Sequence, residues 1–271
     1  MALDNPAFSR NKAFSSKGAV AAVPDVSATE LQEMYDRPTT PNDREVMTVE
    51  DTIAKSALSF GILLAGAAVG WFTASAMPWL WIGAAIVGLV LGLVNSFKRE
   101  PSPALILIYA AVQGVFVGAI SAFFETMVPG IVGQAVIATL VVVGVTLALF
   151  ASGKIRASAK ATKIFLVAMI GYAVFSLVNF GLMIFGGTDS AFGLRSEPSF
   201  LFGIPWGVLI GIFVVILAAY SLVLDFDFIQ QGVKNRAPRK YGWTAAFGIM
   251  VTVIWLYLEI LRMLAIMQSS D

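Results

Sequence analysis

The chain has 271 residues, of which 58% are hydrophobic and only 13% are charged, with a mean hydropathy of +0.82 and a formal net charge of +1. Soluble domains carry about 25% charged residues, so this composition predicts an integral membrane protein. The absence of cysteine and histidine excludes disulfides, thiol nucleophiles, Cys/His zinc sites and histidine acid–base chemistry. Neither a Walker loop nor a serine nucleophile elbow is present. We therefore expect no enzyme activity and no cofactor.

Residues 1–46 are predicted to form a polar, disordered tail on the cytoplasmic side. They are rich in Ser, Ala, Pro and charge and show no sustained hydrophobic period, which is typical of solvated linkers. Residues 1–51 hold nine acids and five bases, so the tail is acidic. The first apolar stretch begins only near Ile53, so we expect no cleavable signal peptide and insertion through the first span.

Seven apolar stretches define a second domain, residues 47–271. Thr48-Val-Glu-Asp51 matches a variant of the capping box that starts a helix. Each stretch is close to the ~20 residues that an α-helix needs to cross ~30 Å of hydrocarbon. We expect an all-α integral membrane protein whose seven transmembrane helices lie at about residues 53–76, 79–97, 103–125, 130–151, 163–185, 203–225 and 243–267.

The distribution of basic residues predicts the orientation. Counted on alternate sides of the spans, sixteen Lys and Arg residues fall on the side of the tail, and two, Arg195 and Arg262, fall on the other. Cytoplasmic loops are enriched in Lys and Arg, so the N-terminus is expected in the cytoplasm and, with seven spans, the C-terminus outside. The sequence thus predicts a multi-pass protein of the cell inner (plasma) membrane.

Two acids lie where a bilayer disfavours them. Asp225 follows the apolar run Ile212–Leu224, and Glu259 lies inside Val253–Leu261. An ionisable side chain within a span costs at least ~2.5–3.5 kcal/mol and is usually functional. Removal from water favours the neutral form of a carboxyl group, and a second carboxylate nearby adds to that effect. A pair formed by the two acids would be protonated at low pH, and charged and attractive to calcium at higher pH.

Each acid also has a structural explanation. Asp225 and Asp227 lie near the predicted cytoplasmic end of the sixth span, where water would solvate them, and their spacing of two points them to different faces of a helix. Arg262 follows Glu259 by three residues and would neutralise it in an ion pair. We take Asp225 and Glu259 as candidate pH-sensing and calcium-binding residues, with Asp227 and Arg262 as auxiliary residues.

Other polar residues inside the spans are interpreted as helix-packing residues. Gly114 and Gly118 form a Gly-xxx-Gly spacing, which predicts close approach of another helix. Tyr172 is expected to be a packing or interface anchor. Interhelical hydrogen bonds are expected from Gln113, Gln134, Thr139 and Asn179.

The segments that carry the two acids resemble the last two helices of the Bax inhibitor-1 (YccA-like, transmembrane Bax-inhibitor-motif) family. These segments are Leu222-Val-Leu-Asp-Phe-Asp-Phe-Ile229 and Trp255-Leu-Tyr-Leu-Glu-Ile-Leu-Arg262. Gln113-Gly-Val-Phe-Val-Gly-Ala-Ile-Ser121 and Gln134-Ala-Val-Ile-Ala-Thr139 are similar to the middle of that family. Met47-Thr-Val-Glu-Asp51 and the polar tail look like a bacterial, actinobacterial-type branch. The resemblance covers roughly residues 47–267.

This resemblance implies a pH-sensitive calcium leak and suppression of stress-induced death. It also implies a pH-sensing pair of acids in the last two helices, which falls here on Asp225 and Glu259. Position 113 is Gln where many members have an acid, and no arginine lies inside the second span, where some members have one.

The predicted function is a pH-sensitive calcium leak channel gated by a carboxylate pair, with the lipid bilayer and calcium or protons as partners. The alternative is a non-conducting membrane regulator. It would bind a membrane protease or a stress-response protein through the acidic tail and the basic inner loops. Topology explains the basic residues of those loops, so no nucleic-acid binding is expected.

Overall fold

The computed structural model describes residues 46–187, 190, 192–199 and 203–269. The predicted tail, residues 1–46, lies outside the described residues except for Val46. The long helices are α3 (Val49–Thr73), α4 (Pro78–Phe97), α5 (Pro103–Met127), α6 (Ile131–Ala151), α7 (Ala159–Ile184), α8 (Trp206–Lys234) and α9 (Gly242–Ser269). Two short 3-10 helices, η3 (Gly193–Ser196) and η4 (Arg239–Tyr241), precede α8 and α9.

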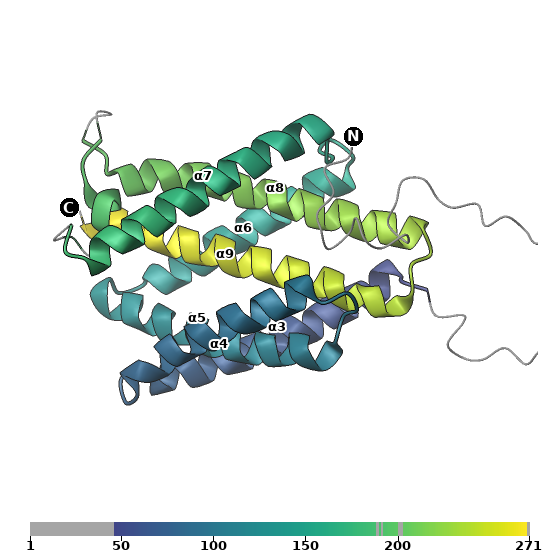
Figure 1. Ribbon diagram of the computed structural model, residues 1–271, viewed down its shortest axis with the longest axis horizontal. Helices are drawn as coiled ribbons and strands as arrows, with labels where there is room; N and C mark the ends of the chain where they lie inside the picture. Colours follow the sequence, from purple (N-terminus) through teal and green to yellow (C-terminus); the bar gives the residue numbers. More distant parts are fainter. Residues whose placement is uncertain (1–45, 188–189, 191, 200–202, 270–271) are drawn as a thin grey trace, which may run out of the picture.

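Seven helices of the described part of the chain are long and apolar enough to cross a membrane. This confirms the expected all-α fold with seven candidate spans. Because the spans alternate in direction, α3, α5, α7 and α9 begin at one end of the bundle, which we call the tail end. The loop between α7 and α8 and the end of α9 lie at the opposite end, which we call the far end (Figure 1).

The start of α3 is fixed to the loop between α8 and α9. The Thr48 hydroxyl accepts a hydrogen bond from the Asp51 backbone N–H at 3.1 Å, which confirms the predicted N-cap. The Asp51 carboxylate forms ion pairs with Lys55 and with Arg239 of η4. The Met47 backbone N–H donates a hydrogen bond of 2.8 Å to the Ala237 carbonyl oxygen. The tail end is therefore held together by contacts between the first described residues and the loop before α9.

The largest difference from the sequence expectation concerns α8, which ends at Lys234 rather than near residue 225. Its additional turns carry Ile229, which packs in a small buried cluster with Met47 and Ala245. That apolar contact continues the helix past the expected boundary. As a result, Asp225 does not lie at a helix end but nine residues, or ~14 Å, inside it.

Helix α9 is the central helix of the bundle. It crosses the middle of the view in Figure 1 (yellow) and contacts α3, α5, α6 and α8. More than half of its membrane-crossing window is buried, and Met250, Leu256 and Leu261 are fully enclosed. A polar side chain on the buried face of α9 is therefore surrounded by protein rather than by lipid.

Helices α3 and α5 approach each other closely. A methyl group added to Gly114 or Gly118 would collide with the backbone carbonyl oxygens of Leu63 and Ala67, respectively. Small residues permit such contact between membrane helices. The predicted role of the Gly-xxx-Gly spacing is confirmed.

Helix α7 is peripheral. Asn179 is its one buried residue among those described, and α7 makes few contacts with α8 or η3. Its described contacts with the rest of the bundle lie near its start and along its second half. At the tail end, the hydroxyls of Thr162 and Tyr220 lie 3.0 Å apart. Further along α7, Tyr172 binds Glu259 of α9 and Asn179 binds the loop before α8, as described below.

Candidate functional site

Asp225 faces α9 from the middle of α8. Its Oδ2 atom accepts a hydrogen bond of 2.7 Å from the Thr252 hydroxyl, which lies 3.3 Å from the Ser221 hydroxyl. Gly248, one turn before Thr252, leaves room for the carboxylate, because a Cβ atom there would lie only 3.1 Å from Asp225 Oδ1. Asp225 is partly buried between the two helices, so its charge is held by one hydroxyl in a largely apolar setting.

No basic side chain in the described part of the chain forms an ion pair with Asp225. Asp227 is two residues later and on a different face of α8. Among the described residues, neither an ion pair nor a hydrogen bond involves the Asp227 side chain. Asp225 and Asp227 therefore do not form a pair, which agrees with the prediction from their spacing.

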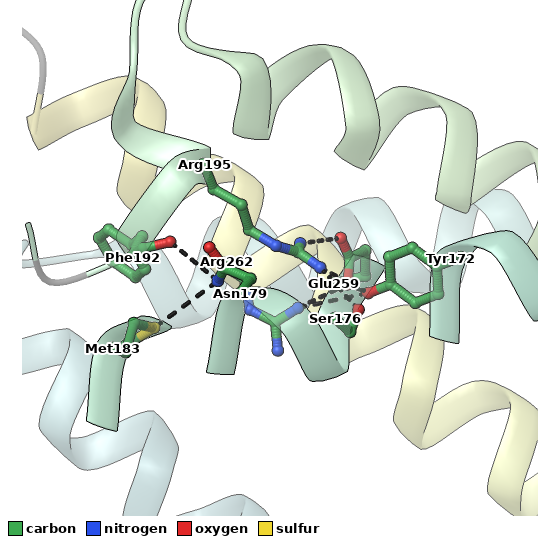
Figure 2. Close-up of polar contacts among 8 residues, drawn as sticks. All are labelled: Tyr172, Ser176, Asn179, Met183, Phe192, Arg195, Glu259 and Arg262. Atoms are coloured by element: carbon green, nitrogen blue, oxygen red, sulfur yellow. Dashed lines mark hydrogen bonds and ion pairs between the residues drawn. The ribbon is translucent and has the colours of Figure 1, made fainter. Parts of the chain in front are cut away.

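Glu259 has a very different environment, with only 1% of its surface exposed. Its Oε1 accepts a hydrogen bond from Arg195 Nη1 at 3.0 Å. Its Oε2 accepts from the Tyr172 hydroxyl at 2.6 Å and from Arg262 Nη1 at 2.8 Å. Figure 2 shows both guanidinium groups directed toward this one carboxylate. The ion pair expected between Glu259 and Arg262 is present, and a second arginine reinforces it.

Arg195 reaches this position from η3 at the far end. Asn179 of α7 holds η3 in place. Its Oδ1 accepts a 2.8 Å hydrogen bond from the Leu194 backbone N–H, and its Nδ2 donates to the Phe192 carbonyl oxygen at 3.2 Å (Figure 2). Asn179 thus binds a loop rather than another spanning helix. Burial opposes the charge of Arg195, but Glu259 outweighs it and raises the pKa of Arg195 above its usual value. The guanidinium is therefore a permanent cation.

The two candidate acids do not form one pair. Asp225 is bound to Thr252, and Glu259 lies seven residues further along α9, ~10 Å along the helix axis. Each carboxylate has its own set of partners. The expected carboxylate pair must therefore be corrected to two separate sites, because Arg195 and Arg262 already neutralise Glu259 at a different depth from Asp225.

The same separation affects the expected calcium site at these acids. Among the described residues, no group of three or more acidic, His or Cys side chains is placed to hold a metal ion. Calcium prefers six to eight oxygen ligands. The hydrogen bond between Thr252 and Asp225 Oδ2 brings two side-chain oxygens together. These oxygens alone do not complete a calcium shell.

Arg195, Ser176 and Tyr172 are site residues that the sequence reasoning did not select. Arg195 Nη2 donates to the Tyr172 hydroxyl at 3.1 Å and to Ser176 Oγ at 3.2 Å. Tyr172, expected as a packing anchor, is a hydrogen-bond partner of Glu259. One signal was available: Arg195 and Arg262 are the two basic residues that fall on the side depleted of positive charge, and both bind the same buried acid.

The comparisons with known proteins agree with this architecture. The family model described as Bax inhibitor 1 like matches residues 5–269. This match includes most of the tail as well as all seven spans. No curated protein matches the chain. Since the match covers nearly the whole sequence and the structure has seven candidate membrane helices, the chain belongs to the Bax inhibitor 1 like family of multi-pass membrane proteins.

Proposed function

We propose that this protein is a pH-sensitive cation leak of the plasma membrane, with calcium as the permeating ion and Asp225 as its pH sensor. One observation carries the proposal. Asp225 is a carboxyl group inside a membrane helix, and in the described part of the chain it has a hydroxyl partner but no cationic one. Such residues in membrane proteins mark ion and proton pathways. The pH-sensitive calcium leak implied by the family resemblance supplies the class of ion.

The chemistry follows from the two states of this carboxyl group. At low pH the protonated group is neutral and fits the contact with Thr252 and Gly248, so α8 and α9 stay packed. At higher pH the group is an anion with no cation beside it. A charge at this depth is unfavourable unless water or a cation reaches it. Deprotonation therefore favours a state in which α8 and α9 separate near Asp225 and admit cations.

Glu259 has a different role in this proposal. Two arginines and a tyrosine hydroxyl already bind its carboxylate, so both of its oxygens are occupied. It fastens η3 and α7 to the central helix α9. This division of roles replaces a two-carboxylate gate with one sensor and one structural lock.

Calcium flux into liposomes tests the proposal. Purified protein is reconstituted in vesicles that contain a calcium-sensitive dye, and the initial rate is recorded at intervals from about pH 5 to about pH 8, the range expected for a desolvated carboxyl group. Wild-type vesicles are expected to leak faster at higher pH. Asp225→Asn should lose the pH response, because an amide has no charged form in this range. Asp227→Asn makes the same charge change on another face and should keep it.

Three results would count against the proposal. Wild-type flux no greater than that of empty vesicles would exclude the leak. A full pH response in Asp225→Asn would exclude the sensor. A pH response that is lost in Glu259→Gln but kept in Asp225→Asn would reverse the roles assigned to the two acids.

A further inference from the structure

Glu259, Arg195 and Arg262 line a cavity of about 430 Å³ at the far end, between α7, α9 and η3. Its volume falls within the range of about 300–1,000 Å³ that is typical of ligand sites. Figure 2 shows its charged and polar lining groups, which are Glu259, Arg195, Arg262, Tyr172, Ser176 and Asn179. The remaining walls are apolar and include Phe180, Met183 and Trp255.

The charges that line this cavity do not balance. Two guanidinium groups face one carboxylate, which leaves one net positive charge among the lining residues. Buried charges are stable when they are paired. Glu259 already accepts hydrogen bonds at both oxygens. The cavity therefore has a cationic group in excess and no carboxylate oxygen without a donor.

Arg262 is the group that supplies the excess charge. Its Nη1 atom binds Glu259 at 2.8 Å and approaches the Tyr172 hydroxyl at 3.5 Å. Its Nε and Nη2 atoms donate to no protein atom in the described part of the chain, and 36% of its side chain is exposed. A guanidinium group presents five N–H donors in a planar fork that suits phosphate oxygens. Arg262 can thus bind Glu259 with one arm and an external anion with the other.

The position of Arg262 along α9 indicates the source of that anion. It lies seven residues, or ~10 Å, before the end of the helix. A helix of 28 residues spans ~42 Å, which exceeds the ~30 Å of hydrocarbon. The Arg262 side chain is therefore within reach of lipid phosphate groups. Beside it, Phe180 and Met183 provide apolar surface for an acyl chain.

We infer that this cavity binds an anionic phospholipid, whose phosphate pairs with Arg262 and whose acyl chain lies along the apolar wall between α7 and α9. The lipid would tie the peripheral helix α7 to the central helix α9, adding to the Tyr172–Glu259 hydrogen bond and the Tyr172–Trp255 ring contact that already join them. Arg262 lies ten residues, or ~15 Å, further along α9 than Thr252, the partner of Asp225, and occupancy of the cavity does not depend on the proposed leak.

Thermal unfolding of the full chain in a neutral detergent tests the inference. Tryptophan fluorescence gives Tm during titration with short-chain phosphatidylglycerol, with short-chain phosphatidylcholine, or with inorganic phosphate, all at one ionic strength. A ligand that binds only the folded state raises Tm with its concentration. Phosphatidylglycerol is expected to raise Tm of the wild type, and the other two probes are expected to leave it nearly unchanged.

Three variants assign the effect to the cavity. Arg262→Gln should bind phosphatidylglycerol about tenfold more weakly, which corresponds to one lost hydrogen bond to a charged group. Arg156→Gln removes an exposed arginine at the tail end and should bind like the wild type. Arg262→Lys keeps the ion pair with Glu259 but not the fork, so it should fold normally and still bind more weakly. If Arg262→Gln does not fold, Arg262→Lys tests whether the cavity binds phosphatidylglycerol.

Four results would overturn the inference. They are an equal Tm rise with phosphatidylcholine, an equal rise with inorganic phosphate alone, no rise with phosphatidylglycerol, or unchanged affinity in the Arg262 variants. The second result would show a free-anion site instead of a lipid site.

Discussion

Removal of the Arg195 guanidinium should destabilise the protein strongly. In Arg195→Gln, Glu259 would keep Arg262 and Tyr172 as partners but would lose the more deeply buried of its two cations. The side chains of Arg195 and Glu259 are only 4% and 2% exposed, against 36% for Arg262. The Glu259 charge would then depend on the one cation that solvent or lipid can reach.

The magnitude follows from the burial of the pair. Breaking a buried ion pair by removing one partner costs about 3–5 kcal/mol, because an uncompensated charge remains. Arg262 offsets part of that penalty here, so we expect a loss of about 3 kcal/mol in the free energy of unfolding. The double variant Arg195→Gln/Glu259→Gln should be more stable than the sum of the two single effects predicts, by about 2 kcal/mol, because neither charge is left alone.

The assay is reversible unfolding in mixed detergent micelles, followed by tryptophan fluorescence for the wild type, both single variants and the double variant. Arg99→Gln is the control for loss of an arginine charge at an exposed position and should change stability by less than about 0.5 kcal/mol, as expected of a surface site. A cost below about 1 kcal/mol for Arg195→Gln would refute the reasoning, as would strict additivity in the double variant.

Thr252→Val keeps the shape of the side chain but removes the one hydrogen bond that the described residues make to the Asp225 carboxylate. Because that bond stabilises the charged carboxylate by about 1.5–3 kcal/mol, the midpoint of the pH response of calcium flux should move by about one pH unit or more toward higher pH; an unmoved midpoint would contradict the proposed sensor. Gly118→Ala places a methyl group against the Ala67 carbonyl, so unfolding measurements should show a loss of about 2 kcal/mol, whereas a neutral effect would mean that α3 and α5 do not need their close contact. Deletion of residues 1–45 should leave calcium flux in liposomes intact, and loss of flux in the shortened protein would instead assign the tail a part in conduction.

The number of helices was predictable because hydropathy reports it directly. A stretch of about 20 apolar residues must be covered by lipid or protein, so each of the seven spans leaves a signal in the sequence. The end of α8 was not predictable in the same way. Gln230 and Gln231 reduce the hydropathy just after Asp225, while the contact of Ile229 with Met47 that continues the helix is tertiary.

The partners of Asp225 and Glu259 were likewise predictable from the sequence only where they lie close together on one helix. The pair of Glu259 with Arg262 follows from a spacing of three residues on one helix, and the structure contains it. The contribution of Arg195 depends on how η3 folds back onto α9, which involves residues 64 positions apart. A pair of Asp225 and Glu259 was expected because the family resemblance implies two pH-sensing acids in the last two helices. They do not meet, since the depth of each acid depends on where α8 ends and α9 begins.

The central claim is that protonation of Asp225 controls the leak, and infrared difference spectroscopy tests it most directly. In reconstituted wild-type protein, a carboxylic acid C=O band should disappear as pH rises, and Asp225→Asn should lack that band while Asp227→Asn retains it. The account predicts that the midpoint of this band coincides with the midpoint of calcium flux in the same vesicles. A band that persists in Asp225→Asn, or two midpoints that differ by more than about one pH unit, would contradict it.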